Sequence, residues 1–272
     1  MAARMIVRNP LIDPVPEEVP LERAPLARVV CAVHFPAILK IVDGTGAGIA
    51  AFQESIRREY PTLEQEVEQS VTIQLGDNKT ISPQVTANVV WRFTDKEKAW
   101  RVTLGREVLA LDTQTGYTNR KAFLDRFDTI AHAFIEALEP AQCTRIGTRY
   151  VNVLTGEMID RFQDYVQPEF RAFGHQPFLQ DLVAGNQVAE FRVPEGRLIV
   201  RAGIHKPGQT HDPSILPPID AVRYFLDLDG VNLEPRDFSP SGIRSAAEGL
   251  TERVYTMFRW AVTDNLLEVC NG

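Results

Sequence analysis

The 272-residue sequence is poor in cysteine and contains fewer basic than acidic residues. Its three cysteines, Cys31, Cys143 and Cys270, are far apart and form no CxxC pair, so we expect neither a disulfide framework nor a zinc site. Lys and Arg number 29 against 36 Asp and Glu, a formal net charge of -7. Because binding to phosphate backbones needs a basic surface, a nucleic-acid partner is not expected.

Long apolar runs and targeting segments are also missing. No stretch approaches the roughly 18 apolar residues of a membrane span, and Met1 to Val7 has no apolar segment of signal-peptide length. We therefore expect a cytoplasmic protein with reduced thiols and no membrane partner. A chain of this length can bury a sizeable core as one large or two small domains.

Catalytic and cofactor motifs are absent as well. Three glycines occur between Asp43 and Gly48, but the segment runs into Ile-Ala-Ala instead of Gly-Lys-Ser/Thr, and it contains no GxGxxG. We interpret it as a connection between elements. The sequence has no GxSxG and no convincing Cys/His pair. No cofactor and no metal are predicted.

The longest apolar periodicity lies at the C-terminal end, from Pro240 to about Val269. Ser239 is a good N-cap and Pro240 suits the first helical position. Apolar residues then recur at spacings of three and four, which predicts one long helix with an apolar stripe. Thr263-Asp264 resembles a second cap that could bend it.

The remaining pattern predicts an α+β fold with two antiparallel sheet units packed against helices and closed by the C-terminal helix. We expect an extended proline-rich arm over residues 1–25, an N-terminal unit over 26–155 and a C-terminal unit over 156–272 packed on the first. The predicted elements in order are strand Leu26–Phe35, helix Ile49–Tyr60, a meander from Thr62 to Thr113, helix Tyr117–Leu138, strand Cys143–Leu154, helix Met158–Phe173, and strands Leu179–Val193, Arg197–His205 and Ala221–Asp229.

Two proline-rich segments are candidates for binding. The arm contains five prolines between Pro10 and Pro25, which favours an extended segment that either follows its own surface or crosses onto a second subunit. The segment Lys206 to Ile219 contains four prolines and is expected to be a capping or partner-binding loop.

Five short segments together resemble an uncharacterised, sporadically distributed bacterial protein family of roughly this length. The resemblance covers nearly the whole chain and rests on Pro25-Leu26 with His34-Phe35-Pro36, on Trp91-Arg92-Phe93-Thr94, on Arg145-Ile-Gly-Thr-Arg-Tyr-Val-Asn152, and on Phe225-Leu-Asp-Leu-Asp229. The family carries no established activity. Its patchy distribution implies an accessory role of the defence or toxin–antitoxin type.

Asp227 and Asp229 are the first candidates for chemistry, since spacing of two on a strand places both carboxylates on one face, as an acid/base or metal pair requires. Arg197, Arg201 and His205 share one face of the preceding strand. If the two strands are neighbours, a salt-bridged polar face explains all five residues without catalysis. The catalytic candidates are thus Asp227, Asp229 and His205, with this alternative beside them.

Arg145 and Arg149, together with Arg201, are candidates for binding a phosphate or carboxylate. Pairing with an acidic neighbour such as Asp112 is the competing interpretation. Alternation places Tyr150 and Asn152 on the opposite face of the same strand. His205, His211 and Asp212 could also form a metal trio.

From these observations we expect a non-catalytic binding or interaction protein with a protein partner or a small ligand, and possible homodimerisation. The alternative is a hydrolase or phosphate-ester-handling enzyme that uses Asp227, Asp229, Arg201 and His205.

Overall fold

The computed structural model describes residues 7–42, 47–75, 81–174 and 181–271. The Asp43–Gly48 segment lies largely outside them. The elements in chain order are β1 (Leu26–His34), α1 (Leu39–Val42), α2 (Ala47–Ile56), β2 (Thr62–Leu75), β3 (Ile81–Thr94), β4 (Trp100–Leu104), β5 (Val108–Thr113), α3 (Arg120–Leu138), β6 (Gln142–Cys143), β7 (Arg145–Leu154), α4 (Glu157–Asp160), α5 (Phe162–Tyr165), η1 (Pro168–Phe170), β8 (Gly185–Val193), β9 (Gly196–His205), β10 (Arg223–Asn232), β11 (Arg236–Asp237), α6 (Pro240–Ala261) and α7 (Asp264–Cys270).

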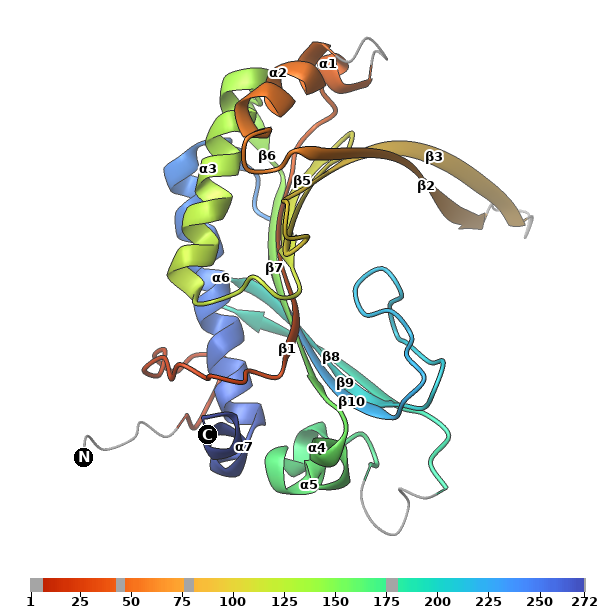
Figure 1. Cartoon of the computed structure of the whole chain (residues 1–272), viewed down its shortest axis with the longest axis vertical. Helices are drawn as coiled ribbons and strands as arrows, with labels where there is room; N and C mark the ends of the chain where they lie inside the picture. Colours follow the sequence, from red (N-terminus) through yellow and green to blue (C-terminus); the bar gives the residue numbers. More distant parts are fainter. Residues whose placement is uncertain (1–6, 43–46, 76–80, 175–180, 272) are drawn as a thin grey trace.

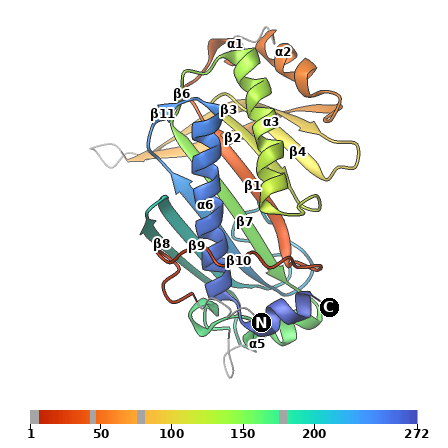
Figure 2. The same cartoon turned by 90° about the vertical axis from the view of Figure 1, so that its left-hand side faces the viewer.

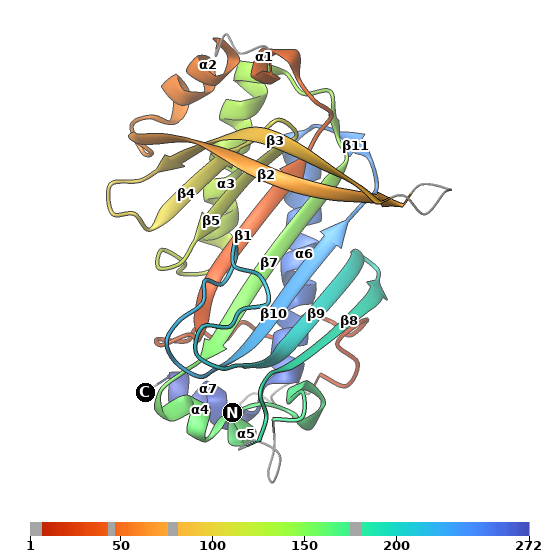
Figure 3. The same ribbon diagram turned by 90° about the vertical axis from the view of Figure 1, so that its right-hand side faces the viewer.

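Nine strands form one antiparallel sheet in the order β2-β3-β4-β5-β1-β7-β10-β9-β8 (Figure 3). The expected α+β class is confirmed. The two predicted sheet units are joined edge to edge, because β7 pairs with β1 on one side and with β10 on the other. Only Trp91–Thr94 of β3 pairs with β4, so the rest of β2 and β3 extends beyond the sheet as a two-stranded ribbon (Figure 1).

Helices α3 and α6 lie side by side on one face of this sheet (Figure 2). The predicted start of α6 is confirmed: Ser239 accepts a hydrogen bond from the backbone of Gly242, and Pro240 is the first helical residue. The predicted single helix to Val269 is instead two helices. The chain is extended at Val262 and Thr263, and α7 starts at Asp264.

Two clusters of buried apolar side chains fill the space between the sheet and its helices. One joins β1, β5 and α3 to the first half of α6, including Ile243, Ala247 and Leu250. The other joins β9 and β10 to the second half of α6 and to α7, including Val254 and Met257. Helix α6 therefore contributes to both clusters.

The predicted helix from Met158 to Phe173 is wrong. This segment forms two single turns, α4 and α5, and the 3₁₀ turn η1. Pro168 has no N–H to continue a helix and disfavours helical dihedrals at the preceding residue, Gln167, which is extended at φ -62° and ψ 148°.

The N-terminal arm packs against its own chain along α6. The guanidinium of Arg253 donates to the carbonyl oxygens of Pro10 and Asp13, and the hydroxyl of Tyr255 accepts from the backbone of Val19. At its end the arm meets α7, where the backbone N–H of Arg23 donates to Cys270. The arm thus follows its own surface over the described residues 7–25. No helix in the described ranges is long and apolar enough to cross a membrane.

Candidate functional site

Arg145 and Arg149 of β7, Arg201 of β9, and Asp227 and Asp229 of β10 lie together on the sheet face that points away from α3 and α6. The ladders pair Asp229 with Arg149 and Asp227 with Arg201, and directly paired residues share a face. Arg145 lies on the same face, four residues from Arg149 along β7. The sequence placed these residues on strand faces correctly, and the structure shows that the faces are one.

Asp227 is the centre of this polar face and is completely buried. Its two carboxylate oxygens accept from Arg149 Nε, at 2.8 Å, and from His211 Nε2, also at 2.8 Å. Arg149 Nη1 also donates to Asp212 of the β9–β10 loop at 2.9 Å. Burial alone acts to raise the pKa of Asp227, but the hydrogen bonds from Arg149 and His211 outweigh it, and this pKa is lowered.

Asp229 is bound more loosely. Its closest cation is Arg201, whose Nη1 lies 3.7 Å from Asp229 Oδ2 and 3.8 Å from Asp227 Oδ2. Burial raises the pKa of Asp229. The predicted pairing of the aspartates with Arg201 across the ladder is confirmed, and it accounts for these carboxylates as parts of a salt-bridged face.

Pairing of Arg149 with acidic neighbours is confirmed, but the neighbours are Asp227 and Asp212. The example Asp112 is wrong: Val30 of β1 lies between Asp112 and Arg149 in the ladders, and Asp112 binds Arg28 and Arg101 at 3.0 and 2.9 Å. Pairing of Arg197 with the aspartates is also wrong, since Arg197 binds Glu190 at 2.8 Å. Arg145 makes no ion pair within the described part of the chain, and its Nη1 lies 3.0 Å from His34 Nε2.

His205 and His211 serve to hold the β9–β10 loop against the sheet. Each ring stacks on Phe225 with centroids 4.2 Å apart, and the two histidine rings stack on each other with centroids 5.3 Å apart. Asp212 points instead to Arg149, so the possible metal trio does not form. Across the residues that the structure describes, no group of three His, Cys, Asp or Glu side chains could hold a metal ion. The loop thus contacts the polar face through His211 and Asp212.

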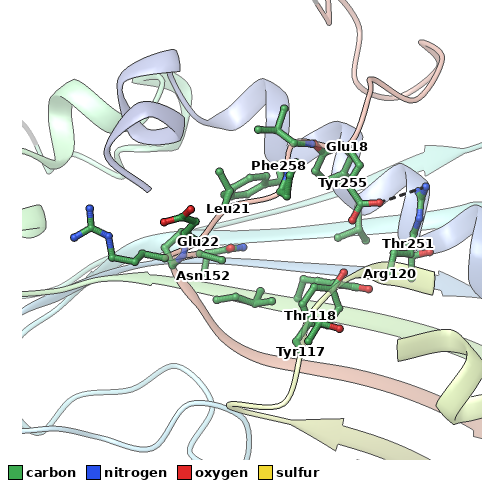
Figure 4. Close-up of a pocket in the computed structure, with 18 of the residues that line it drawn as sticks. Glu18, Leu21, Glu22, Tyr117, Thr118, Arg120, Asn152, Thr251, Tyr255 and Phe258 are labelled. Carbon is green, nitrogen blue, oxygen red and sulfur yellow. Dashed lines mark hydrogen bonds and ion pairs between the residues drawn. The ribbon is translucent and has the colours of Figure 1, made fainter. Parts of the chain in front are cut away.

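A second candidate site lies on the opposite face, between the N-terminal arm, α6 and the loop that precedes α3 (Figure 4). It is a cavity of about 310 Å³, within the size range of small-molecule sites. Tyr150 and Asn152 of β7 line it, and residues 18–25 of the arm and Leu26 of β1 border it.

The cavity has an apolar wall and a polar end. Leu21, Val254 and Phe258 contribute the wall, while Tyr117, Tyr150 and Arg120 contribute the polar end. Figure 4 shows Leu21 and Phe258 close together, with Glu22 beside Leu21. The rings of Tyr117 and Tyr150 meet edge to face with centroids 5.7 Å apart. Burial raises the pKa of Tyr117 to about 12, and burial also raises that of Tyr150 well above its ordinary value. Both phenols are therefore protonated at neutral pH.

Two buried polar atoms at this end have no hydrogen-bond partner among the described residues, Tyr150 Oη and Arg120 Nη1. The hydroxyl of Tyr150 lies near that of Tyr117 without the geometry of a hydrogen bond. Arg120 Nη1 lies 3.4 Å from Glu252 Oε1, and its Nη2 lies 3.9 Å from Glu18 Oε2. Buried donors without partners are costly, so this end of the cavity is suited to an acceptor.

Sequence reasoning missed this site. Tyr150 and Asn152 were placed on the correct face, but Glu18, Tyr117, Arg120 and Phe258 come from distant segments that share no motif. The only sequence signal was the proline-rich arm. No protein-family model matches the chain, and no curated protein is similar to it.

Proposed function

We propose that this chain is a non-catalytic binding protein that holds a small amphipathic ligand in the cavity between its N-terminal arm and α6. One observation carries the proposal: a cavity of about 310 Å³ is lined by two residues with a buried polar atom, Tyr150 Oη and Arg120 Nη1, that has no hydrogen-bond partner in the described residues. A mostly apolar pocket with a few convergent polar groups is the usual form of a ligand site.

The contacts of the polar face argue against catalysis there. Asp227 is completely buried and bound to both Arg149 and His211, so it has no free oxygen for an acid/base step. His205 is also buried, with 2% of its surface exposed. An accessory bacterial role is proposed on the resemblance of the sequence segments alone.

Native mass spectrometry of the gently purified full chain tests the proposal. We expect a population that carries one small molecule per chain. In a Leu21→Trp variant the larger side chain fills the cavity from the arm, so the bound mass should disappear. Ile12→Trp is the matched control, because Ile12 is an arm residue outside the cavity and 65% exposed.

A bound molecule that survives Leu21→Trp would place the ligand elsewhere. A chain that never retains a small molecule, from its own host or after incubation with apolar compounds, would contradict the proposal. A stoichiometric second protein in its place would favour an interaction module.

A further inference from the structure

We infer that the ligand of this cavity carries a carboxylate, which binds Arg120 in the position that Glu18 of the arm now occupies. The inference rests on the proposed function and names the chemical class of the ligand: an apolar body with one acidic head group.

The ion pairs of Arg120 are unusually long. Charge-assisted hydrogen bonds from a guanidinium to a carboxylate normally span about 2.7–2.9 Å. The contacts of Arg120 with Glu252 and Glu18 measure 3.4 and 3.9 Å, and its side chain is 22% exposed. Neither glutamate therefore reaches hydrogen-bonding distance of a charge-assisted pair, and a ligand carboxylate in the place of Glu18 can bind Arg120 more closely than Glu18 does.

Glu18 is placed so that it can leave without moving the arm. The backbone on both sides of it is fixed by α6: Tyr255 Oη donates to the carbonyl of Glu17 at 3.2 Å and accepts from the N–H of Val19 at 2.9 Å. The Glu18 side chain itself is 42% exposed. A rotation of this side chain toward solvent uncovers Arg120 and leaves the arm in place.

Charge balance favours an acid over other head groups. When a ligand carboxylate replaces Glu18, the number of charges around Arg120 stays the same. An amine would instead meet the guanidinium of Arg120 and raise the local positive charge. The protonated hydroxyls of Tyr117 and Tyr150 add donors at the same end, which a carboxylate can accept.

Other lining residues suit an apolar body. Leu21, Leu26, Val254 and Phe258 line the cavity, and Figure 4 shows Leu21 and Phe258 close to each other. A phenyl or short alkyl group buried there contributes through removal of apolar surface from water.

Isothermal titration calorimetry on the full chain tests the head group with three probes of one body: 4-phenylbutanoate, 4-phenylbutanamide and 4-phenylbutylamine. We expect the acid to bind at least about tenfold more tightly than the amide, which corresponds to about 1.4 kcal/mol, and the amine to bind most weakly. Glu18→Gln should raise the affinity for the acid several-fold and leave the affinity for the amide unchanged. Arg120→Gln should lower the affinity for the acid to that for the amide.

Arg126→Gln is the matched control, since Arg126 lies on α3 and outside the cavity; it should leave the preference unchanged. If Arg120→Gln melts at a much lower temperature, Arg120→Lys replaces it, because lysine keeps the charge and loses the bidentate fork. If the acid and the amide bind with equal affinity, and neither variant changes this, the inference of a carboxylate ligand is overturned. The cavity would still be a ligand site. If none of the three probes binds, the inference is overturned, and native mass spectrometry with Leu21→Trp decides separately on the cavity.

Discussion

Two aspartates on one strand, Asp227 and Asp229, have opposite pKa shifts although they are only two residues apart. The difference follows from their partners. Arg149 and His211 bind Asp227 at 2.8 Å and lower its pKa. Asp229 has an ion pair with Arg201 at 3.7 Å, and burial outweighs the nearby charges of Arg149, Arg145 and Arg201 and raises its pKa. A buried carboxylate is stable as an anion only where hydrogen bonds replace its lost hydration.

Removal of Asp227 should therefore destabilise the fold. We expect Asp227→Ala to lower the free energy of unfolding by about 3–5 kcal/mol, because it leaves Arg149 without its main partner in a buried position. Urea denaturation followed by circular dichroism measures the change. Glu190→Ala is the control: Glu190 and Arg197 are both about half exposed, and their pair should contribute less than about 1 kcal/mol. An unchanged melting temperature in Asp227→Ala, with altered biological activity, would favour the enzyme alternative.

Two histidines should make stability depend on pH. Burial lowers the pKa of both His34 and His205 to about 4, from an ordinary value of 6.5. Between these values the unfolded chain binds more protons than the folded chain, so the free energy of unfolding falls as the pH is lowered through this window. We expect His34→Gln to reduce the slope of this free energy against pH, measured by urea denaturation at several pH values.

His132→Gln is the control for this experiment, because His132 is exposed on α3. The same slope in His34→Gln as in the unmodified chain would show that His34 does not contribute to it.

At the scale of elements, the sequence predicted what depends on local pattern. Ser239 and Pro240 mark the start of α6, and alternation in β1 places Val29, Cys31 and Val33 in the core. The failed helix had apolar residues at helical spacing, Phe162, Val166 and Phe170. The spacing of these residues predicted a regular helix, but the chain leaves helical dihedrals at Arg161 and again at Val166 and Gln167, directly before Pro168.

The partners of charged residues could not be predicted in the same way. Asp112 and Arg149 lie on strands that each pair with β1, and the sequence does not give this strand order. The cavity depends even more on long-range arrangement, since Glu18, Arg120 and Phe258 meet only after the arm crosses α6. Local pattern therefore predicted the polar residues of single strands but not the site at the opposite face.

At the scale of the whole molecule, α6 connects the two apolar clusters. Ile243, Ala247 and Leu250 belong to one cluster, and Val254 and Met257 belong to the next turns of the same helix and to the other cluster. The β7–β10 ladder joins the same two regions through the sheet. If either cluster unfolds, apolar surface of α6 is exposed, and the remaining cluster loses packing from the same helix. This favours one cooperative unfolding transition.

Tryptophan fluorescence can test this coupling, because the three tryptophans report on both regions. Trp91 and Trp100 pack against the first cluster and Trp260 against the second. Two variants are compared, one that retains only Trp100 and one that retains only Trp260. In each variant we expect the urea midpoint measured by tryptophan fluorescence to equal the urea midpoint measured by circular dichroism. A different result would contradict the coupling: the fluorescence midpoint lies well below the circular dichroism midpoint in the Trp260 variant but not in the Trp100 variant. Residues 26–155 and 156–272 then unfold as separate units. In that case neither the shared helix nor the shared sheet is sufficient to couple them.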